Sequence, residues 1–168
     1  HKMVTKDGEA IAVIPGVFRS SGSDHEFAFI MIYNSVNDQV HLERFSMDDF
    51  KAYSDSYSVQ IGENRFSSKG LGLKIHSPDI SIQGNIDFSV LSPWPVTWRE
   101  PGCMGWYGYM PFMECFHGIL SMDHSLTGRI INDDIEIDFE GGKGYIEKDW
   151  GRNFPRAWIW TQANHFQN

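Results

Sequence analysis

The strongest constraint on the fold is a period of two in the apolar residues, repeated along most of the chain. In the segment DIEIDFE (134–140), Ile135, Ile137 and Phe139 alternate with acidic side chains. Such alternation puts apolar side chains on one face of a β-strand and polar side chains on the other. A 3.6-residue period, the sign of an amphipathic helix, is nearly absent. The sequence therefore predicts an almost entirely β structure built from antiparallel strands.

Other strand-like segments follow one another with short turns between them. They cover residues 10–18, 27–33 and 39–45, and shorter ones follow between residues 57 and 91. Many short strands at this spacing are typical of a barrel or a sandwich. Ser46, with an acid three positions later, predicts one short helix within residues 46–53. A 14% aromatic content and 16 glycines suit twisted, bulged strands around a large apolar interior.

Length and charge limit the classes of partner. A chain of 168 residues fits a single domain with its own core. The net charge of −8 argues against nucleic acid, because binding phosphates requires many Lys and Arg side chains.

No apolar run approaches the roughly 18–20 residues of a transmembrane helix. No secretory signal is visible, so we expect a cytoplasmic protein, although a start at His1 leaves a removed signal open.

One long segment, residues 92–118, breaks the rhythm of strands and turns. It holds four of the seven prolines and many aromatic side chains. Long connections without regular structure are uncommon in compact domains and are often lids or binding loops. A plug that seals one end of a barrel is the alternative. The aromatic residues are Trp94, Trp98, Trp106, Tyr107, Tyr109, Phe112 and Phe116.

Strong metal and nucleophile motifs are absent from the sequence. Glu114, Cys115, His117 and His124 contain zinc-ligand residue types, but their spacing matches no strong zinc pattern, so we expect no metal site. There is no G-x-S-x-G nucleophile motif. Cys103 and Cys115 are too few for a disulfide framework, and we interpret them as free thiols.

The C-terminal stretch RAWIWTQANHF (156–166) has an unusual face. Alternation puts Trp158, Trp160, Gln162 and Asn164 on the same side of a strand. Two indoles followed by two amides suit a ligand cavity that is apolar with a few hydrogen-bonding groups. The alternative is that the indoles fill the interior and the amides bind neighbouring loops.

The segment GYIEKDWGRNFPRAWIWTQANHF (144–166) resembles the signature of the tocopherol cyclase family and its bacterial members. Residues 111–128 and 8–17 are also similar to bacterial members. The resemblance implies two lipocalin-like β-barrel halves around a hydrophobic cavity, a fold related to carotenoid hydratases. Members are usually longer than this chain. We therefore expect residues 1–168 to form one antiparallel lipocalin-like β-barrel domain, the N-terminal half of that architecture.

The resemblance also implies a reaction. A tocopherol cyclase protonates a trisubstituted alkene in a prenylated hydroquinone, and the phenolic oxygen captures the tertiary cation, with no redox cofactor. Such a site needs a carboxylic acid kept protonated by burial, and aromatic faces near the cation. Glu147 matches the acid of the family, and Asp149 stands where plant enzymes carry Asn. The implied catalytic residues are Glu147 and Asp149, and the implied ligand-binding residues are Tyr145, Trp150, Trp158, Trp160, Gln162 and Asn164.

Two interpretations of Glu147 stay open. Alternation places Tyr145, Glu147 and Asp149 on one face and Lys148 on the other. If that face is the inner one, burial beside indoles favours the protonated carboxyl that a proton donor needs. Otherwise Glu147 is ionised and held by Arg152 or Arg156, as a structural latch.

Three functions follow from these interpretations. The first is a cyclase acting on an isoprenoid or prenylquinol, without a cofactor. The second is a non-catalytic, lipocalin-like carrier or sensor of a small apolar ligand. The third is a structural half-barrel that works only within a larger chain or a homo-oligomer.

Overall fold

The computed structural model describes residues 1–20, 25–153, 156, 157 and 159, and none of them lies in an α-helix. No helix in this part of the chain has the length and apolar character needed to cross a membrane. The elements in chain order are β1 (Lys2–Val4), β2 (Ala10–Phe18), β3 (Phe27–Asn34), β4 (Gln39–Phe45), the 3₁₀ turn η2 (Met47–Asp49), β5 (Phe50–Ala52), β6 (Ser58–Ile61), β7 (Asn64–Ser67), β8 (Gly70–Ser77), β9 (Ile80–Phe88), the 3₁₀ turn η3 (Gly105–Tyr109), β10 (Cys115–Asn132), β11 (Ile135–Asp138) and β12 (Lys143–Gly151).

The strands form one 12-stranded antiparallel sheet, which confirms the predicted all-β class. Its order is β4-β3-β2-β1-β12-β10-β9-β8-β7-β6-β5, and β11 pairs with β10 off this path. The predicted lipocalin-like barrel is not found, because the sheet stays open: its end strands β4 and β5 do not pair with each other. The chain turns through η2 between these strands, and β5, with three residues, offers only a short edge for pairing.

The predicted helix at residues 46–53 is reduced to the single turn η2. The Ser46 hydroxyl caps this turn by accepting a hydrogen bond from the Asp48 amide at 3.2 Å. The chain becomes extended again at Phe50, the first residue of β5. The cap was therefore correctly placed, but the residues after η2 belong to the sheet.

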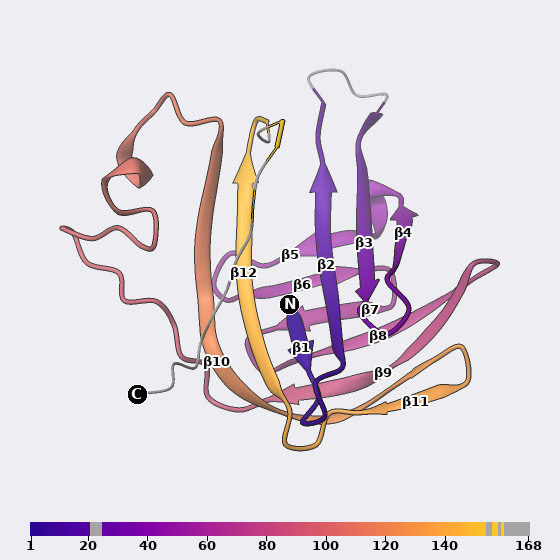
Figure 1. Cartoon of the computed structure of the whole chain (residues 1–168). Helices are drawn as coiled ribbons and strands as arrows, with labels where there is room; N and C mark the ends of the chain where they lie inside the picture. The colour runs from indigo at the N-terminus through magenta and orange to yellow at the C-terminus, as the bar shows by residue number, and fades with distance from the viewer. Residues whose placement is uncertain (21–24, 154–155, 158, 160–168) are drawn as a thin grey trace.

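The long strand β10 joins two halves of the sheet. Its first part pairs with β12 from Cys115 to Ser125, and its last part pairs with β9 from Leu126 to Asn132. The pairing with β12 has two register shifts, on either side of Ser121, and such bulges bend a strand. In Figure 1, β2, β3 and β12 stand upright in front of β5–β9, which run across behind them. The sheet thus folds over on itself.

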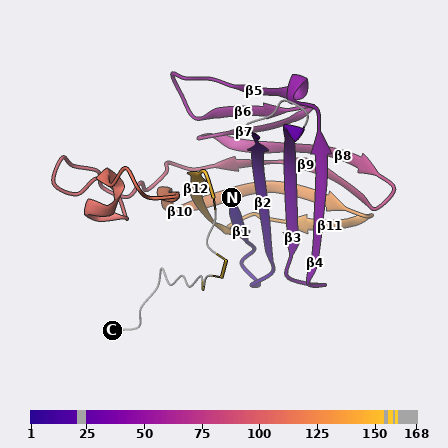
Figure 2. The same ribbon diagram turned by 90° about the horizontal axis from the view of Figure 1, so that it is seen from above.

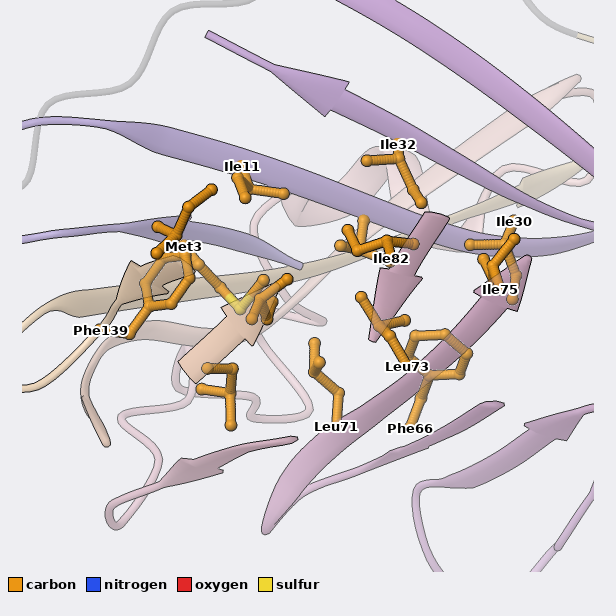
Figure 3. Close-up of a cluster of buried hydrophobic side chains, with 14 of the residues drawn as sticks. Met3, Ile11, Ile30, Ile32, Phe66, Leu71, Leu73, Ile75, Ile82 and Phe139 are labelled. Atoms are coloured by element: carbon orange, nitrogen blue, oxygen red, sulfur yellow. The ribbon is translucent and has the colours of Figure 1, made fainter. Parts of the chain in front are cut away.

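The hydrophobic core fills the space between the two halves (Figure 3). Ile30 and Ile32 from β3 are buried together with Phe66, Leu73 and Ile82 from the other half. Burial of alternate residues explains why the strands were visible in the sequence. The close-up shows side chains from both halves pointing into the same space.

Residues 89–114 connect β9 to β10 and project away from the folded sheet (Figures 1 and 2). Apart from η3, residues 89–114 contain no helix or strand, whereas the predicted irregular segment 92–118 runs into β10, which begins at Cys115. Glu114, the last residue of the connection, precedes β10. Its carbonyl accepts a hydrogen bond from the Arg152 amide at 2.8 Å. The connection is thus attached to the start of β10 and to the end of β12.

His124 is a buried polar residue beside the core. Its Nδ1 lies 3.0 Å from the Ser121 hydroxyl, and its ring centroid lies 4.7 Å from that of Phe88. The other side of the ring packs against Gly144, where a Cβ atom would collide with it. Burial lowers the pKa of His124 to about 4, although Asp123 opposes the shift.

We expect this histidine to make the fold sensitive to mild acid. The unfolded chain protonates His124 near its ordinary pKa of 6.5, whereas the folded chain does so only near 4. The stability that depends on a neutral His124 is therefore fully present above about pH 6.5. The free energy of unfolding falls by about 3 kcal/mol as the pH drops toward 4. Urea unfolding across this range should show a smaller loss in His124→Gln than in the parent chain. His25→Gln, at an exposed position, is the matched control, and equal curves for all three chains would contradict the expectation.

Candidate functional site

The predicted site residues of β12 lie on the face opposite the core. Met3 pairs with both Ile11 and Gly144, and these define the core side of the sheet. Lys2 pairs with Tyr145, so Tyr145 lies on the other side. Alternation along β12 places Glu147 and Asp149 on that same outer face. The inner location considered for Glu147 is therefore not the one found.

His117 of β10 brings the two carboxylates together. It pairs in register with Asp149, and its Nδ1 lies 2.6 Å from Asp149 Oδ1. Its Nε2 lies 3.9 Å from Glu147 Oε2. The three side chains are partly exposed, between 27% and 39%. We call His117, Glu147 and Asp149 the His117 cluster.

One carboxylate oxygen of Glu147 lacks a hydrogen-bond partner among the described residues. This oxygen, Oε2, is buried. Burial raises the pKa of Tyr145 above its ordinary value, and a hydrogen bond to Glu147 raises it further. Neither Arg152 nor Arg156 forms an ion pair with Glu147 in the part of the chain that is described. The proposed arginine latch is thus not the arrangement found.

The connection before β10 holds the backbone of His117. The His117 amide donates to Met104 Sδ at 3.0 Å, and the Cys103 thiol donates to the His117 carbonyl at 3.5 Å. Among the described residues no strand pairs with this edge of β10, and the two contacts satisfy its backbone groups. Burial raises the pKa of Cys103 and of Cys115, both of which are free, so the thiols stay protonated.

Aromatic side chains occupy the other face of the same two strands. The rings of Phe116 and Trp150 stack with centroids 5.7 Å apart and 14° between their planes. The Lys148 ammonium lies 5.2 Å from the Trp150 ring centroid. Gly118 leaves room for that indole, since a Cβ atom there would come within 3.3 Å of it. Trp150 is thus held beside a cation, as a cation-binding ring would be.

A groove of about 270 Å³ runs between the connection and the ends of β10 and β12. Its volume is near the lower limit for ligand pockets and suits one ring or part of a prenyl chain. His117 is the member of the His117 cluster that lines it, whereas Trp98, Trp106 and Tyr109 do not line it and are more than half exposed. The lining residues are Trp94, Val96, Pro101, Gly102, His117, Gly118, Ile119, Leu120, Lys148 and Trp150.

The structure brings only part of the predicted site together. Tyr145, Glu147 and Asp149 share a face, and Trp150 lies on the opposite face. Trp158, Trp160, Gln162 and Asn164 lie outside the described residues. In the described ranges no group of three His, Cys, Asp or Glu side chains is arranged to hold a metal ion.

Sequence reasoning considered His117 only as a metal ligand. Its partners lie 30 and 32 positions further along the chain, so the pairing depends on how β10 and β12 align. The two register shifts in that pairing change which residues stand opposite each other. The sequence shows a histidine on one strand segment and two acids on another. It does not show the register that places them side by side.

Comparison with known proteins identifies the family. Residues 21–168 match the family described as tocopherol cyclase-like. The chain is 38% identical over 71 residues to the "Probable tocopherol cyclase, chloroplastic" of Oryza sativa subsp. japonica, covering 42% of this chain and 15% of the rice protein. It is 40% identical over 68 residues to the "Tocopherol cyclase, chloroplastic" of Zea mays, covering 40% of this chain and 14% of the maize protein. No solved structure matches. The chain belongs to the tocopherol cyclase-like family.

Proposed function

We propose that the protein binds a prenylated hydroquinone and cyclises it, with Glu147 as the proton donor. The observation that carries the proposal is the buried Oε2 of Glu147, which has no hydrogen-bond partner among the described residues and lies 3.9 Å from His117, a residue that lines the groove. Two plant relatives with the name tocopherol cyclase support the choice of reaction. As the proton donor, Glu147 would have to carry its proton when the substrate binds.

The reaction is an isomerisation, and it balances without an oxidant or a reductant. The O–H bond of the Glu147 carboxyl breaks, and its proton forms a C–H bond with one carbon of the alkene. The other carbon becomes a tertiary cation, which the phenolic oxygen attacks to form a C–O bond. The phenolic proton then leaves. No cofactor is required for these steps.

The groove supplies what the cation and the apolar chain need. Trp94, Val96 and Leu120 provide apolar walls, and the Trp150 ring provides a face that already accommodates the Lys148 ammonium. An aromatic face stabilises a nearby cation by about 0.5–2 kcal/mol, depending on how dry the site is. Ile119, which lines the groove, stands opposite Glu147 in register. Glu147 itself is not among the residues that line the groove, and Trp150 lines it from the face opposite Glu147.

Turnover in heavy water tests the proposal. The protein is incubated in D₂O with a hydroquinone that carries one trisubstituted alkene, and the product is examined by mass spectrometry. We expect a chromanol with one deuterium on carbon, because the Glu147 proton exchanges with solvent before it is transferred.

Binding is followed in parallel through tryptophan fluorescence, since Trp94 and Trp150 line the groove. Binding without a chromanol would contradict the cyclase and support the carrier or sensor. A lack of both binding and product would reject both functions.

A further inference from the structure

We propose that His117 is the general base of this reaction and returns the phenolic proton to Glu147. The inference rests on the proposed function and deepens it. The cyclisation leaves Glu147 without its proton and releases a proton from the phenol, so repeated turnover needs a path between the two. His117 lines the groove, and its Nε2 lies 3.9 Å from the Glu147 carboxyl.

The contact with Asp149 determines which ring nitrogen can accept a proton. Asp149 Oδ1 lies 2.6 Å from Nδ1, and an ionised carboxylate can only accept a hydrogen bond. Nδ1 therefore carries the hydrogen, and Nε2 of the neutral ring is left with a free lone pair. Asp149 acts as a positioning residue that fixes this tautomer.

The distance from Nε2 to Glu147 is short enough for a proton transfer after a small movement. Nε2 lies 3.9 Å from the unpartnered Oε2 of Glu147. A displacement of about 1 Å would bring the pair within hydrogen-bond distance. The base takes the phenolic proton as the C–O bond forms, and the imidazolium then gives a proton to Glu147 Oε2. Every bond broken is balanced by a bond formed, and both residues return to their starting state.

The groups around the His117 ring determine which side chains can exchange a proton with it. Glu147 and Asp149 approach it from β12, Tyr145 is hydrogen-bonded to Glu147, and Cys103 and Cys115 lie near Asp149. The raised pKa values of Tyr145 and of both thiols keep these three groups neutral. Proton exchange in the site is therefore left to the imidazole and the two carboxyl groups. The bonds to Met104 and Cys103 hold the backbone of His117 during it.

The first test follows product formation before and during steady turnover. In His117→Gln we expect the first turnover to keep its amplitude, because Glu147 begins protonated, and steady turnover to fall about 100-fold. Turnover in this variant should also decline more steeply as the pH rises, since solvent must then resupply the proton. His41→Gln is the matched control, because His41 pairs with Glu43 at 3.0 Å far from the groove.

The second test needs no activity. Nitrogen-15 NMR of the ring should show the hydrogen on Nδ1 of His117 in the parent chain, and loss of that preference in Asp149→Asn. Full steady turnover in His117→Gln, or a hydrogen on Nε2 in the neutral parent ring, would overturn the relay. In the first of these cases the cyclase would still stand. Absence of any turnover in the parent chain would instead reject the cyclase and with it the relay.

Discussion

Glu147→Gln is expected to lower cyclisation of a prenylated hydroquinone by about 100- to 10,000-fold, the usual contribution of a general acid. An amide cannot transfer a proton to an alkene, and Asp149, the other carboxyl near Tyr145 and His117, is engaged by His117 Nδ1 at 2.6 Å. The measurement is the initial rate of chromanol formation at saturating substrate.

The same variant should fold almost as well as the parent chain. The glutamine side chain keeps an oxygen that can accept the Tyr145 hydrogen bond. The contact with His117, at 3.9 Å between partly exposed side chains, contributes little to stability. We expect the melting temperature to change by no more than about 3 °C. Glu63→Gln, which removes an exposed ion pair to Lys74, is the matched control for the loss of one carboxylate.

Two outcomes would contradict this assignment. Retained turnover in Glu147→Gln would exclude Glu147 as the proton donor. A large fall in melting temperature, with turnover reduced only in proportion to the unfolded fraction, would show that Glu147 is a structural residue. Measurement of ligand binding in the variant separates loss of chemistry from loss of the groove.

Strand positions could be predicted because the period of two is a local property. The predicted strand at residues 10–18 has the bounds of β2, and the predicted strand at 27–33 ends one residue before β3 does. Alternation does not indicate depth: in the segment 134–140, Ile137 and Phe139 are buried while Ile135 is 67% exposed. Closure of the sheet was wrongly predicted because it depends on whether β4 and β5 can align, which neither strand shows alone.

In the candidate site, too, features within one strand could be predicted and contacts between strands could not. The shared face of Tyr145, Glu147 and Asp149 followed from their spacing within one strand. The direction of that face depends on the pairing of β12 with β1, and the contact with His117 depends on the register with β10. Both pairings join segments that are distant in sequence. The roles assigned to Glu147 and Asp149 stay predictions, and the experiments above address them.

The strands β9 and β10 approach each other closely at Gly84. Gly84 of β9 stands opposite Ile130 of β10, with a φ of 153°. A Cβ atom at Gly84 would lie 2.2 Å from the Arg129 carbonyl oxygen and 2.8 Å from the Ile130 Cα. Both are backbone atoms of the strand that joins the halves, so relief of the clash requires the strands to separate. Ile82 and Ile86, on either side of Gly84, are buried in the core.

Gly84→Ala is therefore expected to lower the free energy of unfolding by about 2–5 kcal/mol, from backbone strain and overpacking together. For a domain of this size the melting temperature should fall by roughly 5–15 °C. Gly8→Ala is the matched control, because Gly8 has a φ of 94° but no atom within 4 Å of the added Cβ. That control carries the strain without the clash and should cost about 1–2 kcal/mol. If urea unfolding gave equal losses for the two variants, β9 and β10 would not approach as closely at Gly84 as described.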